Sequence, residues 1–187
     1  MIGLKRHTVR VVDHNPGWGD LAVEACRRVR DAGGDLISDV QHVGSTAVPD
    51  LPAKPILDLA AAVTRLDVIP ELIKRLMALG YIYRGDGKDS GGHLFVWESK
   101  PEVRTIHLHV VTLDDSQWSN YLRFRDLLRR DSCLRKRYAK LKEKLVERFP
   151  CDRKSYTDSK HDFIRGVLNW EAQQRVPADA EDGAAEP

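Results

Sequence analysis

Asp58 is a single carboxylate in an otherwise apolar segment. It lies within KPILDLAAAV (residues 54–63), a run that predicts a β-strand covered on both faces. An unpaired carboxylate is costly to bury, so such a group requires a metal ion or a cationic partner. Asp58 is therefore a candidate catalytic and metal-binding residue.

A glycine-serine turn precedes this strand. Gly44 allows a ligand to approach the main chain closely, while Ser45 and Thr46 add two hydroxyl groups to the free backbone N–H groups of the turn. Such donors suit the oxygens of a phosphate group, and a helix N-cap is the alternative role for the two hydroxyls. Together with Asp58, the turn predicts a phosphate-and-metal site.

A pair of histidines occupies a second predicted strand. His107 and His109 alternate within RTIHLHVV, so both side chains point to the same face of the strand. Two imidazoles on one face can bind a metal ion or a phosphate, and His42 and His93 are available as further ligands. With Asp58, the pair predicts one divalent ion, Mg²⁺ or Mn²⁺, with Zn²⁺ as a further candidate. Hydrogen bonding within the sheet is the alternative.

Two cations lie on the apolar stripes of predicted helices. Lys160 shares its stripe with Phe163, and Arg125 shares one with Leu128, so both are expected on packed faces, where a cation needs an anion. A bound phosphate would supply it. Lys54, just before the acidic strand, is a third candidate for phosphate binding, with extension into solvent as its alternative. For the first two, the alternative is an ion pair with Asp126, Asp158 or Asp162.

Five segments, in this order, resemble signatures of one protein family. They are NPGW (15–18), HVGSTAVPDLPAKPILDLAA (42–61), HLHV (107–110), FRD (124–126) and YTDSK (156–160). They are similar to the GrpB-like family of the nucleotidyltransferase superfamily, over about residues 9–169. The resemblance implies a nucleotidyltransferase-like fold and a small-molecule nucleotide, ATP or another nucleoside triphosphate, as substrate or ligand.

The resemblance implies a reaction less directly than a fold. Members of the wider superfamily place two carboxylates two residues apart on this strand to hold two Mg²⁺ ions, whereas Ala60 occupies the second position here, as GrpB-like relatives also tend to lack it. The leading hypothesis is transfer of a nucleotidyl or phosphoryl group to a small acceptor, with Asp58 and His109 as catalytic residues. The alternative is a non-catalytic nucleotide- or coenzyme A-binding module, because GrpB-like domains are also found fused to dephospho-coenzyme A kinase.

HLHVV is also similar to the motif of the histidine-triad nucleotide hydrolases, in which a histidine attacks the α-phosphate. That resemblance would make His109 a covalent catalyst, although Val111 replaces the third histidine. A third hypothesis is RNA binding, because residues 121–170 hold 15 Lys or Arg against 7 Asp or Glu, a balance of +8. Few aromatic residues accompany these charges, so nucleic acid is not the expected partner.

The chain has 187 residues, of which 42% are hydrophobic. Its predicted helices and strands would position the residues named above. We expect a single domain over 1–170, a disordered acidic tail over 171–187, no membrane span and a cytoplasmic location. The fold class is α+β, a mixed β-sheet core flanked by helices with a C-terminal helical part. Predicted helices span 17–32, 68–79, 116–130, 134–148 and 156–170, and predicted strands span 36–43, 56–63, 81–84, 93–97 and 104–111.

Overall fold

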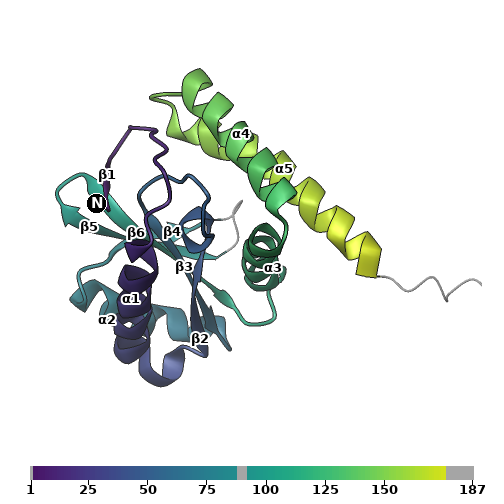
Figure 1. Cartoon of the computed structure of the whole chain (residues 1–187). Helices are drawn as coiled ribbons and strands as arrows, with labels where there is room; N and C mark the ends of the chain where they lie inside the picture. The colour runs from purple at the N-terminus through teal and green to yellow at the C-terminus, as the bar shows by residue number, and fades with distance from the viewer. Residues whose placement is uncertain (1, 88–91, 176–187) are drawn as a thin grey trace, which may run out of the picture.

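A mixed β-sheet of six strands forms the centre of the molecule in the computed structural model, which describes residues 2–87 and 92–175 (Figure 1). The strand order is β2-β3-β6-β5-β4, and the short β1 pairs with β6. The strands are β1 (Leu4–Lys5), β2 (Asp39–Val43), β3 (Leu57–Val63), β4 (Ile82–Asp86), β5 (His93–Lys100) and β6 (Val103–Thr112). The helices are α1 (Gly17–Gly33), α2 (Ile69–Ala78), α3 (Ser116–Arg130), α4 (Ser132–Arg148) and α5 (Arg153–Arg175), with 3₁₀ turns η1 (Gly34–Leu36), η2 (Ser45–Ala47) and η3 (Leu66–Val68).

The central pair, β3 and β6, is parallel, whereas every other strand pair in the described residues is antiparallel. A parallel pair requires a long crossover, and here α2, β4 and β5 provide it. Its register places Asp58 opposite His107 and Ala60 opposite His109. The acidic strand and the histidine strand are therefore neighbours, and their polar side chains share one face of the sheet.

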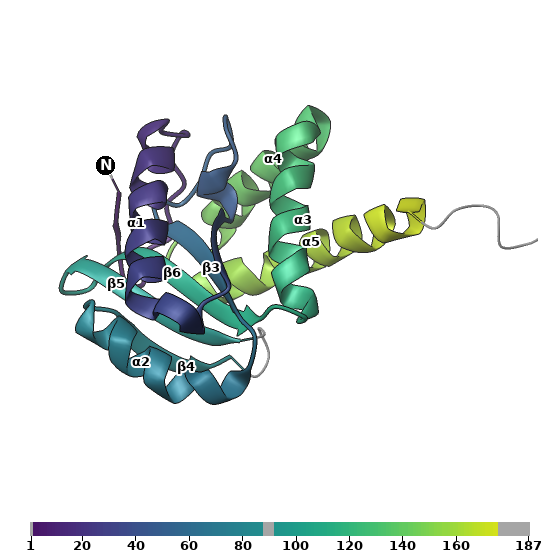
Figure 2. The same cartoon turned by 90° about the horizontal axis from the view of Figure 1, so that it is seen from below.

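Helices cover both faces of the sheet (Figure 2). Helices α1 and α2 bury the face that carries Leu59 and Leu108, and this layer forms the largest apolar cluster. Trp118 of α3 packs against Ala60 and Ala62 on the opposite face. The small alanine side chains let α3 lie close to β3, next to the half of this face that carries Asp58.

The C-terminal helices begin at aspartate caps and pack on one another. Asp115 accepts a hydrogen bond from the backbone N–H of Gln117, and Asp131 accepts one from Leu134, which satisfies free N–H groups at the starts of α3 and α4. Helix α5 continues to Arg175, past the boundary at residue 170 that the sequence predicted, and Arg123 of α3 donates to the buried Glu171 at 3.0 Å.

The α+β class, with a mixed sheet, flanking helices and a C-terminal helical part, is confirmed. The predicted strand over 36–43 begins only at Asp39, because the chain first forms η1. This turn starts at Gly34, whose φ of 56° lies in the left-handed region. Residues 176–187, for which disorder is predicted, and residues 88–91, between the predicted strands over 81–84 and 93–97, lie outside the described residues. None of the helices within 2–87 and 92–175 is long and apolar enough to cross a membrane.

Gly44 joins β2 to η2 in a conformation that suits glycine alone. Its φ is 68°, and a Cβ atom at this position would lie 2.6 Å from Oδ2 and 2.8 Å from Cβ of Asp58. The absence of a side chain therefore allows the turn to pass directly over the carboxylate. Backbone conformation and close approach both require the same residue.

We predict that Gly44→Ala lowers the free energy of unfolding by about 2–4 kcal/mol. The alanine would have to adopt the left-handed backbone conformation of Gly44, and its Cβ atom would clash with Asp58. Urea denaturation would measure the change. Gly19→Ala is the matched control, since a Cβ at this position of α1 meets nothing within 4 Å and helix propensity favours alanine. Equal stability of the two variants would contradict the prediction.

Candidate anion-binding site

A chain of hydrogen bonds joins the sheet to α5 through Asp58. His107 Nδ1 lies 3.1 Å from Oδ1 of Asp58, and its Nε2 lies 2.7 Å from an amino group of Arg153. Arginine can only donate, so Nε2 of His107 accepts and Nδ1 carries the proton that it donates to the carboxylate. These contacts assign a neutral imidazole between an anion and a cation.

The pKa values of these groups agree with that assignment. Burial alone would raise the pKa of Asp58, but the hydrogen bond from His107 and nearby positive charge lower it below its ordinary value. Burial lowers the pKa of His107 to about 4, despite the attraction of Asp58. At neutral pH the aspartate is ionised and the histidine is neutral.

Two lysines that form no ion pair among the described residues lie beside this series of hydrogen bonds. The Nζ atoms of Lys54 and Lys160 are each 4.8 Å from the centroid of the buried Tyr156 ring. Neither forms an ion pair with any residue within 2–87 or 92–175. Burial, followed by repulsion from Lys160 and Arg153, lowers the pKa of Lys54 to about 7. Both ammonium groups therefore occupy a position where an added anion would be stabilising.

A third lysine lies behind the glycine-serine turn. Only 2% of Lys142 is exposed, and its amine donates to the carbonyl oxygen of Pro52 and lies 3.2 Å from Oγ of Ser45. Burial, together with repulsion from Lys160 and Lys54, lowers its pKa well below 10.5. Like the other two lysines, it makes no ion pair among the described residues.

Lys54, Lys142, Arg153 and Lys160 form what we call the cationic cluster. They come from the segment before β3, from α4 and from α5, and they interact electrostatically with one another. Asp58 attracts three of them, and the exposed Glu143 attracts Lys142. Positive charge thus exceeds negative charge in a largely buried region, which is the arrangement of an anion-binding site.

Asp58, His107 and His109, the three predicted metal ligands, are not arranged as a three-ligand metal-binding group. Among the residues that the structure describes, no group of three or more His, Cys, Asp or Glu side chains could hold a metal ion. Both ring nitrogens of His107 already have protein partners, and the His109 ring lies 5.4 Å from the Tyr121 ring. With both nitrogens of His107 engaged, Asp58 and His109 leave two protein donors, and this pair alone does not fit a resident divalent ion.

The other predicted metal ligands are also engaged elsewhere. Nε2 of His42 lies 2.9 Å from the hydroxyl of the buried Thr46, and burial lowers the pKa of His42 to about 4. His93 Nδ1 lies 2.7 Å from the hydroxyl of Tyr83. The hydroxyls of Thr46 and Ser45 are both held by neighbouring side chains, so in this structure they fix the turn itself.

Of the predicted phosphate-binding cations, the structure brings Lys54 and Lys160 together but separates Arg125 from them. Arg125 pairs with Asp126 at 2.7 Å and donates to Gln41 and to the carbonyl of His42 at 3.1 Å, so it ties α3 to the edge strand β2. The ion pair that the sequence analysis gave as its alternative is the one observed. Lys160 makes no such pair, because Asp158 and Asp162 bind Lys154 and Arg165.

The sequence analysis missed Lys142, Arg153 and Tyr156. Lys142 follows Tyr138 by four residues and precedes Leu145 by three, so it shares their apolar stripe, the same signal that identified Lys160. Arg153 carries no comparable signal, since it lies at the start of α5 and meets His107 only through the tertiary fold.

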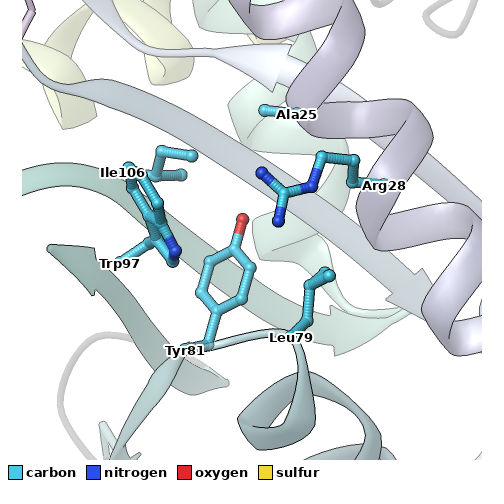
Figure 3. A pocket seen from close by; sticks show the side chains of 6 residues that line it. All are labelled: Ala25, Arg28, Leu79, Tyr81, Trp97 and Ile106. Atoms are coloured by element: carbon cyan, nitrogen blue, oxygen red, sulfur yellow. The ribbon is translucent and has the colours of Figure 1, made fainter. Parts of the chain in front are cut away.

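A small pocket lies on the face of the sheet that α1 and α2 cover (Figure 3). The space open to the centre of a water molecule is about 10 Å³, so the pocket can hold a single water. Ile106, which lines it, points away from the face that carries His107, so the pocket is separate from the cationic cluster. Its lining residues are Ala25, Arg28, Leu79, Tyr81, Trp97 and Ile106.

The fold and the cluster define an α+β protein with a candidate anion-binding site on one face of a mixed sheet. The family model described as GrpB protein matches residues 8–169. The glutamate-rich protein GrpB of Alkalihalophilus pseudofirmus is 32% identical over 172 residues, which are 90% of this chain and 99% of that protein. The chain therefore belongs to the GrpB family, which confirms the resemblance noted in its sequence.

A solved structure supports the same assignment, and an enzyme shares part of the chain. The crystal structure of the conserved protein GrpB from Enterococcus faecalis matches with a TM-score of 0.79 at 28% identity, over 88% of this chain and 98% of that one. A dephospho-CoA kinase of Mycobacterium tuberculosis is 40% identical over 81 residues, which cover 42% of this chain and 20% of the kinase.

We predict that Lys54→Met raises the free energy of unfolding at pH 7 by about 1–2 kcal/mol, because it removes a cation that is costly to bury. The pKa of Lys54 is lower in the folded state than its ordinary 10.5, so the unfolded chain binds more protons between pH 7 and 10.5. Stability should therefore rise with pH in this window, and more steeply in the parent than in Lys54→Met.

Urea denaturation of both proteins at pH 7 and pH 9 measures this difference. Lys140→Met, an exposed position on α4, is the control and should match the parent at both values. A loss of stability in Lys54→Met at pH 7 would show that Lys54 forms a favourable interaction that this account lacks.

Proposed function

We propose that the protein binds a nucleoside triphosphate, with the phosphates held by Lys54, Arg153 and Lys160 of the cationic cluster. The observation that carries this proposal is that Lys54 and Lys160 lie on the Tyr156 ring beside Arg153 with no ion pair to either lysine among the described residues. An anion with several charges would remove the repulsion between these cations and offset the cost of burying them.

The surrounding residues support binding of an extended phosphate chain. Arg153 presents planar donors that suit phosphate oxygens, and Lys54 and Lys160 lie near enough to repel one another. Asp58 contributes indirectly, because it orients His107 and thereby Arg153. The cations take over charge neutralisation, since the residues present do not fit a resident metal ion.

A group-transfer activity is the finer part of this proposal. Nucleotidyl or phosphoryl transfer to a small acceptor builds up negative charge on the departing phosphate, and preorganised cations stabilise that charge. Lys54, Lys160 and Arg153 would serve in this role.

Coenzyme A is the second candidate ligand. It is favoured by the 40% identity to part of a dephospho-CoA kinase, an enzyme named for dephospho-coenzyme A. Coenzyme A also carries a diphosphate, so the same cations would bind it. The proposal then describes a binding module, not a transferase.

Isothermal calorimetry with ATP, GTP, CTP, UTP and coenzyme A, each with and without Mg²⁺, tests the proposal. We expect one of these to bind and Lys160→Met to weaken that binding by at least about tenfold, since a desolvated charge contact is lost. Lys144→Met, an exposed lysine of α4, is the matched control. If no ligand binds, or if Lys160→Met and Lys144→Met bind equally, the proposed site is wrong.

Binding should also depend on the protonation of Lys54. Its pKa of about 7 reflects burial and the facing Lys160, Arg153 and Arg104, with Asp58 acting in the opposite direction. An anion binds the charged lysine, so affinity should fall as pH rises above 7, by up to about tenfold per pH unit. Calorimetry between pH 6 and pH 9 would measure this slope.

Lys54→Met provides the comparison, because ionisation of the ligand affects both proteins equally. The variant should bind more weakly than the parent at pH 6 and lose less affinity between pH 7 and pH 9. Parallel profiles for the two proteins would show that Lys54 does not meet the ligand.

A further inference from the structure

Ser45 and Lys142 form a contact that anion binding does not explain. Nζ of Lys142 lies 3.2 Å from Oγ of Ser45, and the amine also donates to the carbonyl of Pro52. Lys142 is 2% exposed, whereas Ser45 is only half-buried. The hydroxyl is thus backed by a buried amine while its own residue remains accessible.

We propose that Ser45 is a nucleophile activated by Lys142, and that it accepts a phosphoryl group from the nucleoside triphosphate. This inference rests on the proposed function, since the same ligand supplies the phosphoryl group. A hydroxyl within hydrogen-bonding reach of a base is the arrangement by which serine nucleophiles are activated, and lysine serves as that base in some serine enzymes.

The surroundings of Lys142 suit a base. A lysine that is buried, has no ion pair among the described residues and lies near other cations releases its proton readily. Lys54 and Lys160 are the nearby cations, and together with burial they lower the pKa of Lys142 well below its ordinary value. A neutral amine can donate to Pro52 and still offer its lone pair to the Ser45 hydroxyl.

Tyr138 of α4 packs beside the same amine. Nζ of Lys142 lies 4.9 Å from the centroid of the buried Tyr138 ring, so the amine is held near Ser45 from its own helix. Such positioning reduces the orientational cost of the reaction.

The step balances as follows in terms of bonds and protons. Oγ of Ser45 attacks the γ-phosphorus, a new O–P bond forms, and the bond from this phosphorus to the β-phosphate oxygen breaks. The nucleoside diphosphate leaves with the electron pair, and the hydroxyl proton moves to Nζ of Lys142. Lys54 and Lys160 neutralise charge on the phosphates. Water or an acceptor can later take the phosphoryl group.

Incubation of the whole protein with ATP, with and without Mg²⁺, followed by peptide mass spectrometry, tests the inference. We expect phosphoserine at position 45 in the parent and in the exposed control Lys140→Met, and at least about tenfold less in Lys142→Met. Ser45→Ala should carry no phosphate on this peptide. Lys142→Arg retains a charged donor but cannot act as a base, so it should also lose phosphorylation even where it folds as stably as the parent.

Two further measurements separate this inference from the proposed function. Calorimetry with ATP on the same proteins shows whether the ligand binds, and a fluorophosphonate probe tests the nucleophile without ATP. ATP binding with neither phosphoserine nor probe labelling would overturn the inference and leave the proposed function standing. Probe labelling of Ser45 that disappears in Lys142→Arg, with no ATP binding, would support the activated serine and reject the proposed ligand. Equal phosphorylation of the parent and Lys142→Arg would make Lys142 a structural tether.

Discussion

The parallel pairing of β3 with β6 is the constraint on which the site depends. It sets Asp58 opposite His107, and the hydrogen bond between them passes on to Arg153 at the start of α5. One half-buried carboxylate therefore connects the centre of the sheet to a helix that lies nearly a hundred residues further along the chain. Because the aspartate is satisfied by this chain of contacts, the apolar strand tolerates its charge. The backbone of Gly44 lies directly against the same carboxylate.

The cationic cluster is a stability cost that the fold retains. Lys54, Lys142 and Lys160 are brought together by three separate segments, and burial lowers the pKa of each. Replacement of such lysines by apolar residues would favour folding in many proteins, so their position is more readily explained by a bound anion than by packing. In this chain several cations lie around the single carboxylate of Asp58, and Ala60 stands where a two-metal enzyme carries its second carboxylate.

Much of the fold could be predicted from the sequence because its signals are local. The alternation of His107 and His109 identified their shared face, and the apolar spacing along α3 gave its bounds correctly from Ser116 to Arg130. The predicted end of the last helix at residue 170 was less accurate, because Glu171 is buried through contacts with α3 that no local pattern reveals. Nor does the sequence show that Arg153 contacts the second ring nitrogen of His107, one of the predicted metal ligands.

The sequence by itself determined that His107 and His109 share one face of their strand and that the chain turns at Gly44, because the period of a strand and the flexibility of glycine are properties of the local chain. Only the tertiary structure decided which charges meet there. It directed Arg125 to β2 and Asp126, and it brought Lys142 behind Ser45. The energy of an electrostatic interaction depends on the distance between the charges in space. Residues that are far apart in the sequence come close to one another only when the helices pack.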